Sequence, residues 1–218
     1  MPKLITERRH FLRQAMSTGA VSVMAPLLAS PFISTRAMAA DLDLEKALSP
    51  RIFGNADAPI HVVEYFSMTC GHCANFHVTT YPEVKKNWID TGKLRFEYRD
   101  FPLSELAVYG HALARAIPEA GYEAMLDLLL GRQAEWASAP QPLLALQKMG
   151  RIAGINEDEF TAMLTNRPFL EGIVAIAQQG YEEYTIDSTP TFVINGTEVV
   201  KGYQPYEEFS ALLAATAT

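Results

Sequence analysis

The sequence predicts an α/β fold in which an all-helical segment interrupts a unit built of strands and helices. Residues 60–66, IHVVEYF, are rich in β-branched and aromatic side chains, and residues 93–102, KLRFEYRDFP, alternate apolar and polar ones. Both patterns are typical of strands. Residues 104–186 instead repeat apolar side chains at steps of three and four, which predicts helices.

The elements of the first unit follow one another closely. Residues 41–58 read as an extended lead-in that ends in a turn before the first strand. After that strand, a helix is expected with Phe76, Val84 and Trp88 on one face, and Pro82 predicts a kink within it. The strand at 93–102 completes a strand–helix–strand unit.

The helical segment and the second unit carry their own local signals. Asn156 with Glu159 three residues later is the pattern of a helix capping box. Asn195-Gly196 between two short apolar runs predicts a hairpin. Residues 206–215, YEEFSALLAA, are expected to form a last helix.

Residues 1–39 have the three regions of a signal peptide. Basic residues open the chain, residues 14–35 carry no charge, and an Ala-x-Ala site ends at Ala39. Arg8-Arg9 resembles a twin-arginine export signal, although Glu7 stands where Ser or Thr is usual. An uncleaved membrane anchor is the alternative, because the uncharged run is long enough to span a bilayer. The prediction is export to the periplasm or a similar compartment.

The bulk composition excludes one class of function. The 218 residues are 49% hydrophobic and carry a net charge of −7, with 25 acidic against 18 basic side chains. Binding to nucleic acid needs a surplus of basic groups to neutralise phosphates. No nucleic-acid partner is therefore expected.

The only two cysteines, Cys70 and Cys73, lie three residues apart between a predicted strand and a predicted helix. A helix N-terminus favours a thiolate, and His72 can add a positive charge or a hydrogen bond. Cys70 is thus expected to be the nucleophile and Cys73 the residue that resolves a mixed disulfide. A structural disulfide would close almost no loop. Half of a zinc site would lack a second cysteine pair.

Two further positions stand out near the predicted strands. Glu64 lies in the apolar strand at 60–66, where a buried carboxylate is costly without a partner or a role. The alternative is a side chain that reaches solvent from the strand end. Thr189-Pro190 precedes the hairpin, where a proline cannot donate to the sheet.

These motifs together resemble the DsbA-type members of the thioredoxin superfamily. The matching stretches are GNADAPIHVVEYFSMTCGHCANFH, FEYRDFP, STPTFVING and VVKGY. The resemblance implies a thioredoxin-like fold formed by residues 40–103 and 187–218, with an inserted helical domain at 104–186. The dipeptide Gly71-His72 departs from the Pro-His of the best-known DsbA oxidants, so the strength of this pair as an oxidant is open.

The resemblance also implies roles for individual residues. Pro190 would be cis and lie against the cysteine pair, and the backbone of Thr189 would hydrogen-bond an extended substrate. Glu64 would accept a proton beneath Cys73. Met68 and the Thr189-Pro190 loop are candidates for the apolar surface that clients recognise.

The expected function is therefore an exported thiol–disulfide oxidoreductase that gives its Cys70–Cys73 disulfide to reduced client proteins. A monomer without metal or cofactor is expected, recharged by a membrane-bound DsbB-like partner that the resemblance implies. Isomerisation or reduction at the same site is an alternative. Dedicated isomerases usually carry an extra dimerisation domain, for which the lead-in is too short. A non-enzymatic binding or chaperone-like protein with an incidental disulfide is the alternative from another class.

Overall fold

The computed structural model describes residues 42–216, so the predicted signal peptide at 1–39 lies outside the described residues. A five-stranded sheet with the order β1-β3-β2-β4-β5 forms the centre of this part of the chain. The strands are β1 (Arg51–Phe53), β2 (Ile60–Phe66), β3 (Leu94–Asp100), β4 (Thr191–Ile194) and β5 (Glu198–Lys201). Strands β2 and β3 are parallel, and the other neighbours are antiparallel. The predicted α/β fold is confirmed.

The strand and hairpin predictions are confirmed in detail. Strand β2 covers the predicted residues 60–66. Asn195 and Gly196 connect β4 and β5 with φ angles of 50° and 71°. Two consecutive positive φ angles are what a tight hairpin turn needs, and asparagine and glycine adopt them at low cost.

The extended lead-in predicted for residues 41–58 is wrong. This stretch contains helix α1 (Leu44–Leu48) and the edge strand β1. Asp43 caps α1 by accepting a hydrogen bond from the backbone N–H of Lys46 at 3.2 Å. Strand β1 pairs with β3, which lies more than forty residues later in the chain. Elements this short are stabilised by distant partners and leave no periodic pattern in the sequence.

The helix after the cysteine motif is not a regular α-helix. It consists of α2 (Gly71–Asn75), the π turn η2 (Phe76–Thr80), α3 (Tyr81–Val84) and a second π turn, η3 (Lys85–Ile89). A kink was predicted at Pro82. The helix instead widens into the π turn η2 just before this proline. Proline lacks an N–H and crowds the preceding turn, which disfavours regular α-helical bonding there. The predicted face is kept, because Phe76 and Val84 are fully buried.

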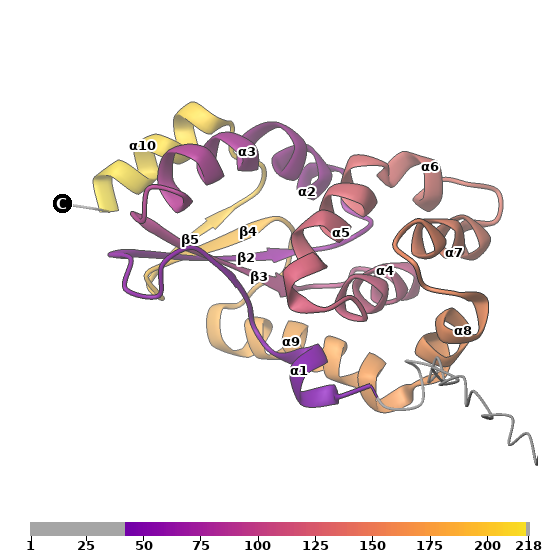
Figure 1. Cartoon of the computed structure of the whole chain (residues 1–218). Helices are drawn as coiled ribbons and strands as arrows, with labels where there is room; N and C mark the ends of the chain where they lie inside the picture. Colours follow the sequence, from indigo (N-terminus) through magenta and orange to yellow (C-terminus); the bar gives the residue numbers. More distant parts are fainter. Residues whose placement is uncertain (1–41, 217–218) are drawn as a thin grey trace, which may run out of the picture. The chain divides into compact units, whose positions relative to one another are not determined.

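The helices between β3 and β4 are here called the helical block. Its members are α4 (Glu105–Arg115), α5 (Glu119–Gly131), α6 (Gln133–Ala137), α7 (Pro142–Ile152), α8 (Glu157–Thr165) and α9 (Arg167–Tyr184). The expected capping box of Asn156 and Glu159 opens α8. Figure 1 shows α4 to α8 gathered beyond the end toward which β2 runs. Helix α10 (Tyr206–Thr216) ends the described chain.

The sheet has a helical layer on each face. Figure 1 shows α2, α3 and α10 on one side of it, and α1 and α9 on the other. Side chains alternate along β2 accordingly. Val62 and Phe66 join the large core that includes Cys73 and Phe76, whereas Tyr65 packs in a smaller cluster on the α9 side. Within residues 42–216, no helix has both the length and the apolar character needed to cross a bilayer.

Candidate active site

Cys70 lies at the point where β2 has ended and α2 begins. It is the N-cap residue of α2 and is partly exposed. Its backbone N–H donates to the carbonyl of Ser67 at 3.0 Å, and its own carbonyl accepts the first helical bond from Ala74 at 3.1 Å. The sequence prediction that Cys70 occupies a helix N-terminus is confirmed.

The surroundings of Cys70 favour its thiolate. A hydrogen bond with Cys73 lowers the pKa of Cys70 to about 5, and the backbone N–H groups of His72 and Cys73 contribute in the same direction. These N–H groups belong to the first turn of α2, where helical donors have no partner within the helix. Partial burial opposes the shift but is outweighed.

Cys73 has the opposite environment although it lies one turn away. Its side chain is 1% exposed and packs in the main core. Burial raises the pKa of the Cys73 thiol well above its ordinary value, and the hydrogen bond with Cys70 and the charge of Glu64 add to the rise. Both cysteines are free thiols in this structure. The pair therefore combines one accessible, acidic thiol with one shielded, weakly acidic thiol.

The loop before β4 closes the site from the other side. The Thr189-Pro190 peptide bond is cis, as the family resemblance implied. The Cys70 thiol donates to the backbone carbonyl of Thr189 at 3.3 Å, although the two residues are 119 positions apart. The Pro190 carbonyl accepts from the N–H of Gly202 at 2.8 Å, which ties the loop to the end of β5.

Glu64 is buried beneath the helix that carries the cysteines. It lies with Val62 and Phe66 on the face of β2 that packs against α2, and it is 1% exposed. Burial raises its pKa well above the ordinary value, and charge on Cys70 adds to this. Its Oε2 has no hydrogen-bond partner among the described residues. The alternative of a side chain reaching solvent is excluded.

Two other predicted site residues differ from expectation. Met68 was a candidate for the client-binding surface, but its side chain is fully buried and packs against α4, where a Cβ on Gly110 would come within 2.9 Å. Met68 therefore offers clients no side-chain surface. The ring of His72 is exposed and makes no hydrogen bond or ion pair with any described residue. Its contribution to Cys70 comes from its backbone.

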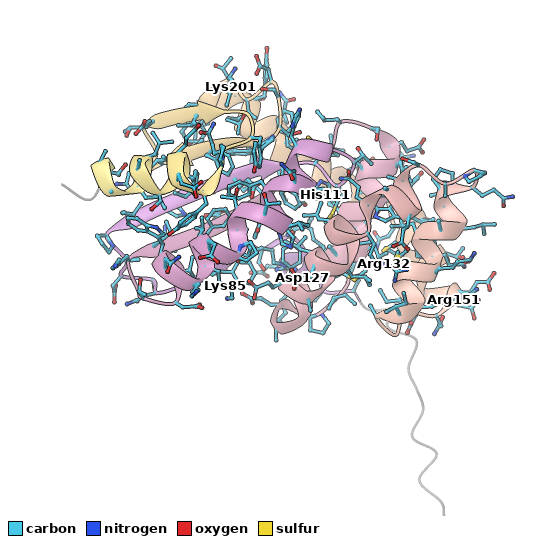
Figure 2. All side chains as sticks on the ribbon, turned by 90° about the horizontal axis from the view of Figure 1, so that it is seen from above. Lys85, His111, Asp127, Arg132, Arg151 and Lys201 are labelled. Atoms are coloured by element: carbon cyan, nitrogen blue, oxygen red, sulfur yellow. The ribbon has the colours of Figure 1, made fainter. Side chains whose placement is uncertain are left out.

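Several site residues carry no signal in the sequence. Gln133 of α6 donates from Nε2 to the carbonyls of Met68 at 2.9 Å and Cys70 at 3.0 Å. His111 of α4 accepts from the Met68 N–H at 3.3 Å through Nε2, and its Nδ1 lies 2.9 Å from Asp100. His111 is fully buried; it is labelled in Figure 2, as is Arg132, the exposed residue before Gln133.

The described residues also bear on metal binding. In residues 42–216, no group of three or more histidine, cysteine, aspartate or glutamate side chains is arranged to hold a metal ion.

Comparison with known proteins agrees with this geometry. The family model described as thioredoxin matches residues 46–215, so the chain belongs to this thioredoxin family. A protein of Rickettsia bellii, named by inference as a protein-disulfide oxidoreductase, is 30% identical over 148 residues, which are 67% of this chain and 57% of that protein. The chain thus spans just over half the length of the curated relatives it matches.

Solved structures support the same fold. DsbA1 of Wolbachia pipientis superposes with a TM-score of 0.71 at 23% identity, covering 78% of this chain and 91% of that one. A protein-disulfide isomerase from Novosphingobium aromaticivorans has a TM-score of 0.68 at 18% identity, covering 78% and 97%. At these identities the likeness concerns the fold, and the chemistry must be argued from the residues themselves.

Proposed function

We propose that this protein is an exported thiol–disulfide oxidoreductase that oxidises client proteins through the Cys70–Cys73 pair. The observation that carries the proposal is the contrast between the two thiols. Cys70 is accessible and has a pKa of about 5, whereas Cys73 is buried and has a raised pKa. Because only Cys70 is stabilised as a thiolate, exchange with clients is expected at Cys70 and not at Cys73.

The first step forms a mixed disulfide. A client thiolate attacks Cys70, because Cys73 is shielded by the core. A bond forms between the client sulfur and the Cys70 sulfur, and the Cys70–Cys73 bond breaks with its electron pair on Cys73. Glu64, kept protonated by burial, supplies the proton that Cys73 takes up, and water restores it. Glu64 is thus a proton donor in this direction and an acceptor in the reverse one.

The second step releases the oxidised client. A second client thiolate attacks the client sulfur of the mixed disulfide, and Cys70 leaves as a thiolate. The client loses two electrons, and the cysteine pair gains them. A low pKa makes Cys70 a good leaving group. The backbone of Thr189, whose carbonyl lies 3.3 Å from the Cys70 sulfur, is the contact we propose for the backbone of an extended client.

A reduced pair must be reoxidised before it can act again. The family resemblance points to a membrane-bound DsbB-like protein, which would take the two electrons through Cys70. The predicted signal peptide at residues 1–39 would place the mature protein, acting as a monomer, in an oxidising compartment where disulfides persist.

Reduction or isomerisation of client disulfides is the alternative use of the same site. Stabilising the Cys70 thiolate stabilises the reduced protein and so makes its disulfide more oxidising. The lowered pKa of Cys70 sets how this effect depends on pH. The stabilisation of the reduced protein is full above the pKa of an unfolded thiol, near 9, and is lost as pH falls through about 5. At neutral pH the oxidant is therefore favoured.

The proposal is tested with Cys73→Ser in cells that secrete disulfide-bonded proteins. This variant can form mixed disulfides through Cys70 but cannot resolve them, so covalent complexes with clients and with the recharging partner should accumulate. Non-reducing gels would show heavier species that disappear on reduction. The double variant Cys70→Ser with Cys73→Ser is the matched control and should form none.

Equilibrium with glutathione separates the alternatives. An oxidant should stay reduced at glutathione ratios that leave structural disulfides intact. No trapped complexes, together with a disulfide that resists glutathione, would overturn the proposal in favour of a binding protein.

A further inference from the structure

The three residues that lead into α2, here called the Met68–Cys70 turn, are fixed by side chains from outside the sheet. The Cys70 N–H donates to the carbonyl of Ser67, the residue just before the turn, at 3.0 Å. Three more peptide groups of the turn bind side chains of the helical block: the Met68 N–H, the Met68 carbonyl and the Cys70 carbonyl. The turn before the nucleophile is therefore held by residues far away in the sequence.

Gln133 makes two of these three contacts. Its amide nitrogen lies 2.9 Å from the Met68 carbonyl and 3.0 Å from the Cys70 carbonyl. Since both neighbours are pure acceptors, only the NH₂ end of the amide can face them. The Cys70 carbonyl also accepts from the N–H of Ala74, so both of its lone pairs are used.

Helix α6, which carries Gln133, is anchored in the core by Trp136. Trp136, one turn later in α6, is fully buried and donates from Nε1 to the carbonyl of Leu129 at 2.8 Å. A Cβ on Gly110 of α4 would approach the Trp136 ring to 3.2 Å and Met68 to 2.9 Å. Helix α4 thus packs closely against both Met68 of the turn and Trp136 of α6.

We propose that Gln133 is a positioning residue for Cys70: by binding both carbonyls it keeps the Met68–Cys70 turn closed and Cys70 at the N-cap of α2. The inference rests on the proposed function, since it concerns how the same thiol is prepared for exchange. It gives the helical block a part in the redox chemistry, because the block supplies this contact.

The physical consequence falls on the Cys70 thiolate. That thiolate depends on N–H groups of the first turn of α2 that keep their direction only while Cys70 stays in place. The Gln133 amide also brings its own positive end close to Cys70. Replacing Gln133 should loosen the Met68–Cys70 turn and destabilise the Cys70 thiolate, while both reacting thiols remain in place.

The test compares Gln133→Met, Gln133→Glu and the control Gln147→Met in the reduced full-length protein. Gln147 is another half-buried glutamine of the helical block and makes no hydrogen bond to the turn within the described residues. The readouts are the pH dependence of Cys70 alkylation, the reduction potential against glutathione and the melting temperature.

Wild type and Gln147→Met should share an alkylation midpoint near pH 5. Gln133→Met removes both hydrogen bonds to the turn and should raise the acid dissociation midpoint of Cys70 by about 0.5 to 1 pH unit. Gln133→Glu should raise it further, because a carboxylate replaces the donor. Both variants should be less oxidising while melting within about 4 °C of wild type.

An unchanged midpoint in both well-folded Gln133 variants would overturn the inference, as would an equal shift in Gln147→Met. The titration reports on the free thiol and needs no client. A Gln133-dependent midpoint in a protein that traps no clients would therefore leave the positioning role intact and reject the proposed function alone.

Discussion

Glu64 on β2 and Asp100 on β3 lie on neighbouring strands, on the same face of the sheet, and neither side chain reaches solvent. Their partners differ. Asp100 is paired with the guanidinium of Arg115 and the ring of His111, both fully or almost fully buried. Glu64 has no charged partner among the described residues, and one of its oxygens has no hydrogen bond.

The two carboxyl groups consequently titrate in opposite directions. Burial alone would raise the pKa of both. The charge of Arg115 holds the pKa of Asp100 well below its ordinary value, whereas burial leaves that of Glu64 well above it. A paired buried carboxylate keeps its charge and supports structure, and an unpaired one keeps its proton. Only the second kind can pass a proton to a neighbour.

The largest effect is expected when the paired carboxylate is neutralised. Asp100→Asn leaves the Arg115 guanidinium buried without a counter-charge, which should lower the free energy of unfolding by about 3–5 kcal/mol. Urea unfolding of the reduced protein at pH 7 measures this. Glu64→Gln is the matched change, and a larger loss there than at Asp100 would break the comparison.

The next effect concerns proton transfer at the unpaired carboxyl. Glu64→Gln keeps the shape of the side chain and removes its ionisable group. If Glu64 exchanges a proton with Cys73, resolution of a small-molecule mixed disulfide on Cys70 should slow about a hundredfold. Stopped-flow release of a chromogenic thiol gives the rate. Cys70 alkylation is the internal control, and equal slowing of both reactions would indicate a packing defect.

The smallest effect is a change in the pH dependence of stability. Because the folded-state pKa of Glu64 is raised, its cost is absent below the unfolded value of 4.5 and grows as pH rises toward the folded value. Glu64→Gln should therefore match wild type at pH 4 and be more stable than wild type at pH 8. Denaturant midpoints at both pH values test this; a constant difference would contradict it.

The sequence predicted the elements whose signals are local. Strand β2 is a continuous run of β-branched and aromatic residues, and the Asn195-Gly196 turn needs backbone angles that these two residues favour. The place of Cys70 at a helix N-terminus follows from a strand before it and helical spacing after it. The cis bond before Pro190 came from the family resemblance rather than from the residues.

The contacts that hold the motif could not be predicted, because they join distant positions. His111 and Gln133 bind Met68 from 43 and 65 residues away. Within their own helices, a buried histidine and a half-buried glutamine look like ordinary helical residues. Met68 was misplaced for a related reason. An apolar residue beside a reactive motif suits either a surface or a core, and only the packing of α4 decides.

Arg115 reaches past Asp100 to the start of the described chain, where it donates to the carbonyls of Ala47 and Ser49, both at 3.0 Å. Helix α1 has only five residues and is too short to persist alone. Its protection from hydrogen exchange should therefore depend in part on the Arg115 guanidinium, which also neutralises Asp100. Amide exchange in α1 should then report on that ion pair from a distance, since α1 and the Asp100–Arg115 pair should open together as one cooperative unit.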